Sequence, residues 1–237
     1  MNRILKVSRL HLNKYDNVVF TPLGIIATVM VVSIIIQLAI QRGTGADVTS
    51  AEYIDGARWN QGIIWSLPGF LVYYGVQAVA TTYPFALALG TTRRNFILGT
   101  MLAYIVQAAY IAVLLVVLLG LELVTNHWFM GVYVLDVHLL GAGNAWMLLA
   151  SAFLGVLFCL SIGGLFAAVW VRFGNKGPAI LGLALGLAVA LTLLVVAPEL
   201  GEIFAGLTRG AVALAALVAI LVALVGTWFA MRRASVR

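Results

Sequence analysis

Charged residues are scarce in this chain. Asp, Glu, Lys and Arg make up only 9% of its 237 residues, whereas soluble domains carry about 25%. Hydrophobic residues make up 63% of the chain, and the mean hydropathy is +1.09. These values exclude an ordinary soluble domain and predict an integral membrane protein.

Several chemical features are also missing. Cys159 is the one cysteine, so no disulfide can form within the chain. The turn at residues 174–177 places a lysine among glycines but lacks the GxxxxGK[ST] spacing of a phosphate-binding loop. We therefore expect no nucleotide site and no enzymatic activity on this chain, and any ATP would be bound by another protein.

Six apolar stretches are each near the ~20 residues that cross a bilayer, and each must be helical because lipid offers no partner to backbone polar groups. The expected fold is therefore all-α, a single transmembrane domain over residues 1–237. The predicted spans are residues 21–41, 62–82, 96–119, 145–170, 178–197 and 211–231.

None of these predicted spans contains an Asp, Glu, Lys, Arg or His residue. Proton-coupled transporters use such groups inside the membrane, so that mechanism loses support. A membrane hydrolase is disfavoured for the same reason. Asp136 and His138 could be two metal ligands, but no third ligand has suitable spacing, so we expect no metal site and an exposed polar face instead.

The charges follow the positive-inside rule when the N-terminus is placed in the cytoplasm. Of the 14 Lys and Arg residues, all but Arg42, Arg58 and Arg209 then lie in cytoplasmic segments. All but one of the eight Asp and Glu residues lie outside. Both termini are therefore expected in the cytoplasm.

Residues 2–17 form a basic, amphipathic segment. Such a segment suits a helix that lies in the cytoplasmic interface, although it could also be a basic tail that only sets orientation. The predicted apolar side carries Ile4, Leu5, Ser8, Leu12, Tyr15 and Val19, and the polar side carries Arg3, Lys6, Arg9, Asn13, Lys14 and Asp16.

Few polar side chains occupy the predicted spans, and hydrogen bonding between helices is their more general use. Tyr73, Tyr74 and Gln77 are the candidates for a substrate cavity, because one short stretch supplies three polar or aromatic groups.

Small residues mark positions where helices can approach closely. Gly182 and Gly186 form a GxxxG pattern on the fifth predicted span, and Gly163 and Gly164 are adjacent on the fourth. These glycines predict helix packing, without establishing a dimer.

The turn between spans two and three is the most distinctive stretch. Residues 83–100 read YPFALALGTTRRNFILGT, and Arg93 and Arg94 are the only Lys or Arg residues between Arg58 and Arg172. A basic turn between two spans can be a plain topological anchor. It can also be a handle through which a cytoplasmic partner moves the membrane helices.

The six spans, the amphipathic start and this turn resemble the permease subunits of bacterial ATP-binding-cassette (ABC) exporters, the type-2 export permease family. In that family the turn is a coupling helix that docks in a cleft of the ATPase subunit, and the N-terminal segment is an elbow helix. The loop at residues 198–210 is shorter than the re-entrant insertion of many family members. The matching pattern, LG-x-T-R-R-x-F, is carried by Leu89, Gly90, Thr92, Arg93, Arg94 and Phe96.

The resemblance implies a multi-pass permease of the bacterial plasma membrane, dimeric with a second copy or a different permease. It would pair with two cytoplasmic ATP-binding subunits, which bind ATP and Mg, and would export a small hydrophobic or amphipathic substrate such as a drug. This chain would hold no cofactor, metal or catalytic residue, and would contact membrane lipids but no nucleic acid. The implied ATPase-coupling residues are Tyr83, Phe85, Leu89, Gly90, Thr92, Arg93, Arg94 and Phe96.

Two other functions stay open at this point. A secondary transporter or channel would act without an ATPase, although the predicted spans lack charges and the chain lacks recognisable repeats. A scaffold would hold a partner complex in the membrane without transporting anything.

Overall fold

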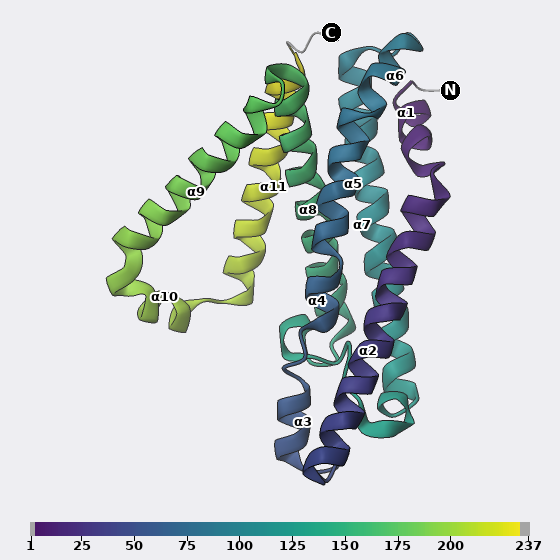
Figure 1. Ribbon diagram of the computed structural model, residues 1–237, viewed down its shortest axis with the longest axis vertical. Helices are drawn as coiled ribbons and strands as arrows, with labels where there is room; N and C mark the ends of the chain where they lie inside the picture. Colours follow the sequence, from purple (N-terminus) through teal and green to yellow (C-terminus); the bar gives the residue numbers. More distant parts are fainter. Residues whose placement is uncertain (1–2, 233–237) are drawn as a thin grey trace. The chain divides into compact units, whose positions relative to one another are not determined.

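The computed structural model describes residues 3–232, which form helices joined by turns and irregular segments (Figure 1). This range contains no strand. Asn2, the start of the expected amphipathic segment, and Arg233 and Arg237, expected in the cytoplasm, lie outside the described residues. Six helical stretches are long and apolar enough to cross a membrane, which confirms the predicted number of spans. They are Asp16–Thr44, Ala51–Ala88, Arg93–Val124, Ala145–Phe173, Lys176–Gly206 and Arg209–Arg232.

The first, second and fifth of these stretches are each composed of more than one helical element. In chain order the elements are α1 (Arg3–Leu12), the π-helical η1 (Asp16–Phe20), α2 (Thr21–Thr44), α3 (Ala51–Ala57), α4 (Gly62–Ser66), α5 (Pro68–Ala80), α6 (Thr82–Ala88), α7 (Arg93–Val124), the irregular turn η2 (His127–Gly131), the 3-10 turn η3 (His138–Leu140), α8 (Ala145–Phe173), α9 (Lys176–Val196), the 3-10 turn η4 (Ala197–Glu199), α10 (Leu200–Gly206) and α11 (Arg209–Arg232).

The described residues belong to two compact units. Unit 1 takes those within residues 1–11, 72–103 and 158–237, and unit 2 takes those within 12–71 and 104–157. Helices α5, α7 and α8 each contribute residues to both units.

In unit 1, α5 packs against α8 with almost no space between the two backbones. A methyl group on Gly163 would collide with the carbonyl oxygen of Val72, and one on Gly75 would collide with that of Leu160. Glycines permit this approach because they present no side chain to the neighbouring helix. Of the predicted packing glycines, Gly163 makes this contact, whereas nothing lies within 4 Å of a methyl group placed on Gly186.

Much of the apolar surface of unit 1 is uncovered. In α9, for example, Leu183 is 75% exposed and Leu187 is 63% exposed. Only Gly177 is buried in that helix. An apolar surface of this extent is unstable in water and suits lipid surroundings.

The N-terminal helix α1 lies against the start of α7 in unit 1. Its buried residues are Val7, Ser8 and His11, whereas Leu5, expected on the apolar side, is 46% exposed. Val7 packs where Gly99 leaves room for it, and a ring nitrogen of His11 lies 3.0 Å from the Thr100 hydroxyl. The side of α1 that carries Val7 and His11 is therefore buried. The helix is rotated about its axis from the orientation in which the predicted apolar side would face inward.

In unit 2, side chains within the spans bond to the backbone of irregular segments. The buried Gln107 donates to the carbonyl of Val18, in η1, over 2.8 Å. Gln37 both donates to the carbonyl of Tyr133 at 2.6 Å and accepts from its N–H at 2.9 Å. Both span glutamines thus form hydrogen bonds, and Gln37 bonds to an irregular segment rather than to a neighbouring span.

The carboxylate of Glu122 holds the segment after α7. Its oxygens accept from the backbone N–H groups of Val134, Leu135 and Asp136 at 3.0, 2.8 and 3.2 Å. Glu122 is completely buried and lies in the last turn of the third membrane-length helix. That helix therefore extends beyond the predicted limit of 119 and contains an acidic group, which the predicted spans lacked.

The first prediction concerns the α5–α8 contact. We expect Gly163→Ala to lower the free energy of unfolding by about 1–3 kcal/mol, because the added methyl must push the two backbones apart. Gly186→Ala is the matched control on α9, and it should leave stability unchanged or slightly raised. Thermal unfolding in detergent micelles would compare them, and equal losses would contradict the contact.

The second prediction concerns Glu122. Glu122→Ala leaves three buried N–H groups without an acceptor, at a cost of about 1–3 kcal/mol each. We expect limited proteolysis to cut residues 126–144 of this variant much faster than those of the unsubstituted protein. The exposed Glu199→Ala serves as the control. Identical cleavage of all three proteins would show that the carboxylate does not hold this segment.

Candidate functional site

The turn between α6 and α7 is built from local helix-ending and helix-starting signals. After α6, the N–H of Gly90 bonds to Leu87 and that of Thr91 bonds to Ala86. Gly90 has a φ of 77°, a left-handed conformation that glycine adopts without strain. Thr92 then accepts the N–H of Asn95 at 3.3 Å, as helix-capping residues do. The Leu-Gly-Thr-Thr sequence therefore fixes a tight reversal of the chain.

Two aromatic residues anchor this turn within unit 1. Tyr83 and Phe96 are 0% and 1% exposed, and their ring centroids lie 5.2 Å apart in an edge-to-face arrangement. They belong to a core cluster that also includes Val7 of α1 and Met231 of α11. Both side chains are thus enclosed by this chain itself.

The other predicted coupling residues lie on the surface of the turn. Phe85 is 55% exposed and Leu89 is 66% exposed. Gly90, Thr92, Arg93 and Arg94 are exposed as well. The turn therefore combines a buried aromatic base with a tip that presents two large apolar side chains beside two guanidinium groups.

Arginines join the turn to the end of α11. Arg93 donates to the carbonyl of Arg232 at 3.0 Å, and Arg172 of α8 donates to the carbonyl of Phe229 at 3.1 Å. Cations stabilise the last carbonyls of a helix, which lack partners within the helix and carry the negative end of its dipole. The start of α7, the end of α8 and the end of α11 therefore meet at one end of unit 1.

The three predicted cavity residues separate onto different faces of α5. Tyr74 is buried, and its hydroxyl donates to the carbonyl of His11 at 3.3 Å. Tyr73 is 56% exposed, and its hydroxyl accepts from Gln77 at 3.0 Å. The structure brings Tyr73 and Gln77 together and uses Tyr74 to hold α1.

The expectation of an exposed polar face at Asp136 is wrong. Asp136 is 1% exposed, and one of its oxygens lies 2.8 Å from Arg58 and 3.0 Å from a ring nitrogen of His127. His138 instead pairs with Asp55 at 3.0 Å. Within residues 3–232, no group of three His, Cys, Asp or Glu residues could hold a metal ion.

Sequence reasoning missed the conformation of the segment before Asp136. Asn126, His127, Trp128 and Phe129 have φ angles of 48°, 59°, 60° and 61°, in a left-handed region that disfavours residues with a side chain. The His127 ring stacks 4.0 Å from that of Tyr133, whose pKa is raised by burial. Asn126 and His127 are of types that adopt this conformation more often than most, whereas Trp128 and Phe129 are not.

Comparison with known proteins does not add a family. No protein-family model, curated protein or solved structure matches the chain.

The third prediction tests the division of the turn into base and tip. Phe96→Ala should lower the free energy of unfolding by about 3–5 kcal/mol, because it empties a buried aromatic position. Phe85→Ala removes the same side chain from an exposed position, and it should change stability by less than about 0.5 kcal/mol. Chemical denaturation in micelles would measure both, and similar losses would contradict the division.

Proposed function

We propose that this chain is the membrane-spanning subunit of an ATP-driven exporter in the bacterial plasma membrane, with the turn between α6 and α7 as its contact with a cytoplasmic ATPase. The observation that supports the proposal most is the construction of the turn. Its base is locked into unit 1 by Tyr83 and Phe96, while Phe85, Leu89 and Arg94 are exposed at its tip.

The tip offers the chemistry that a protein partner needs. Arginine forms forked, charge-assisted hydrogen bonds to carboxylates, and exposed aromatic and aliphatic side chains supply the apolar contacts that dominate interface energy. Phe85 and Leu89 are four residues apart, so they share one face of the end of α6. The exposed side chains would therefore make the contact with the partner. The buried Tyr83 and Phe96 would hold the turn in place without touching the partner.

The rigidity of the turn supports a mechanical role. A force on the tip reaches the helices through the buried aromatic pair and through the bond from Arg93 to the end of α11. Closure of two ATPase subunits around ATP and Mg would shift these helices as one group, and a cavity between two permeases would alternate its access. The second permease is a copy of this chain or a different one.

Charge within unit 1 supports a cytoplasmic position for the turn. Arg93 and Arg172 bond to the end of α11, and Arg94 follows Arg93 in the chain. Helix α9 then carries the chain about 30 Å away over its 21 residues. Beyond it follow the acidic Glu199 and Glu202. Basic residues at one end and acidic residues at the other match the positive-inside rule. Helix α1 would lie at the cytoplasmic end as an elbow-like helix.

A secondary transporter or channel is the second candidate. Glu122 favours it, since an ionisable group in a membrane-length helix is a common element of ion-coupled transport. The three N–H groups bound to its carboxylate also give Glu122 a structural role, which accounts for its presence without ion-coupled transport. Transport that survives ATP depletion and requires an ion gradient would favour this candidate.

The fourth prediction tests the ATPase contact. We expect Arg94→Glu to weaken co-purification of a cytoplasmic ATPase from native membranes by at least tenfold, because a reversed charge at an ionic contact costs about 2–5 kcal/mol. The double variant Arg93→Glu with Arg94→Glu should abolish it. Membrane fractionation should show normal insertion of both variants.

Arg42→Glu is the matched control, since Arg42 is also exposed but ends α2, far along the sequence from the turn. It should retain the ATPase. An ATPase that stays bound to the double variant would refute the contact, and a chain that purifies alone in every case would favour the second candidate.

A further inference from the structure

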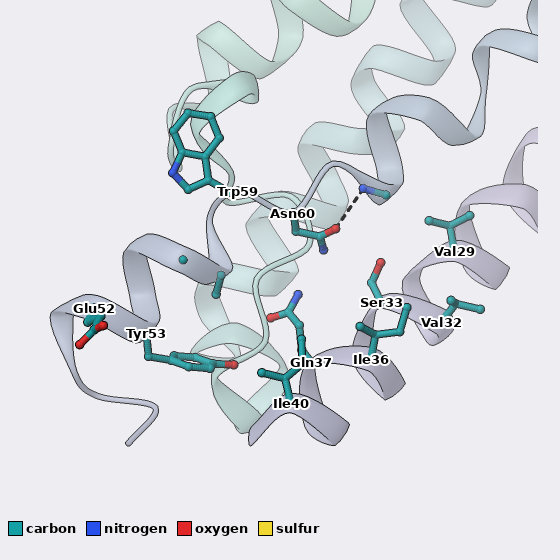
Figure 2. A pocket seen from close by; sticks show the side chains of 13 residues that line it. Val29, Val32, Ser33, Ile36, Gln37, Ile40, Glu52, Tyr53, Trp59 and Asn60 are labelled. Atoms are coloured by element: carbon teal, nitrogen blue, oxygen red, sulfur yellow. Dashed lines mark hydrogen bonds between the residues drawn. The ribbon is translucent and has the colours of Figure 1, made fainter. Parts of the chain in front are cut away.

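Unit 2 contains a cavity that the proposed function does not use. It lies between α2, α3 and the start of α4, and its volume is about 530 Å³ (Figure 2). Small-molecule sites commonly occupy about 300–1,000 Å³. All the residues that line it belong to the segment from Val29 to Gly62.

One wall of the cavity is a long apolar face of α2. Val29, Val32, Ile36 and Ile40 line it, and their spacings of three and four residues place them on one side of the helix. Figure 2 shows these side chains along α2, opposite Tyr53 and Trp59. Eleven helical steps give a length of about 16 Å. A wall of this shape suits an extended alkyl chain.

Two amide side chains beside this wall, Gln37 and Asn60, are already engaged, so the Ser33 hydroxyl is the polar group that remains on the α2 side. Gln37 uses both ends of its amide on the backbone of Tyr133. The side chain of Asn60 donates to the same carbonyl at 3.0 Å and accepts from the N–H of Gly62 at 3.0 Å. A ligand therefore needs no polar group along most of its length.

The α3 side of the cavity carries a carboxylate that has no counter-ion among the described residues. Glu52 lines the cavity, is exposed, and forms no ion pair within residues 3–232. Arg58, the nearest cation in the sequence, is bound to the buried Asp136. Trp59 is 58% exposed. A carboxylate attracts a cation by charge. The indole of Trp59 also lines the cavity, and its ring centroid lies 5.2 Å from that of His138.

We propose that this cavity binds a single-chain lipophilic cation, with its alkyl chain along α2 and its cationic head beside Glu52. The alkyl chain leaves water for an apolar wall, which favours binding roughly in proportion to the area covered. Binding at this site requires neither the ATPase nor the turn between α6 and α7, so its test is independent of the proposed function.

The test is equilibrium dialysis of radiolabelled dodecyltrimethylammonium against the full chain in phosphatidylcholine nanodiscs, with empty nanodiscs as the background. We expect one saturable site per chain, for which dodecyl sulfate, with the same alkyl chain and the opposite charge, competes much more weakly than unlabelled dodecyltrimethylammonium. Ile36→Trp fills the cavity and should weaken binding at least tenfold. Glu52→Gln removes the charge and should weaken it about two- to fivefold.

Val31→Trp is the matched control, because Val31 is 56% exposed on α2 and does not line the cavity. It should bind as the unsubstituted chain does. Should Ile36→Trp fail to fold, Val32→Phe and the surface change Glu52→Gln still test the site. The proposal is overturned by binding no greater than that of empty nanodiscs, by equal competition from dodecyl sulfate, or by a co-purified phospholipid that the probe cannot displace.

Discussion

A backbone polar group in apolar surroundings must find a hydrogen-bond partner, and the irregular parts of this protein depend on that constraint. At several places where the chain departs from an α-helix in unit 2, a side chain from a span supplies the partner. Gln107 bonds to η1, Gln37 bonds to both backbone groups of Tyr133, and Glu122 binds three successive N–H groups. These side chains allow non-helical backbone to remain buried.

The same use of polar side chains to bind the backbone makes the cavity mostly apolar. Because Gln37 and Asn60 are engaged with the backbone, the space beside α2 is bounded mainly by aliphatic side chains, and charge is confined to Glu52 at one edge. The cavity would recognise a ligand by its long apolar chain and by a positive charge at one end of that chain.

The turn between α6 and α7 illustrates a different use of burial. Its helix stop at Gly90 and its cap at Thr92 are local features, while its position depends on aromatic packing with residues from both ends of the chain. A tip that is exposed but rigidly supported can pass a displacement to the helices behind it. A flexible basic loop would absorb the same displacement.

The sequence by itself determined the membrane class and the six spans, because lipid imposes length, apolarity and helical geometry on every crossing segment. It also located the turn and its glycine, since those signals are local. It did not determine which partners the polar residues choose. Tyr83 and Phe85 are two residues apart in one motif, yet one is buried and the other exposed. Asp136 likewise gave no sign of burial, because its partners Arg58 and His127 come from other segments. Only the tertiary structure decided these outcomes, because burial and ion pairing depend on which distant segments meet.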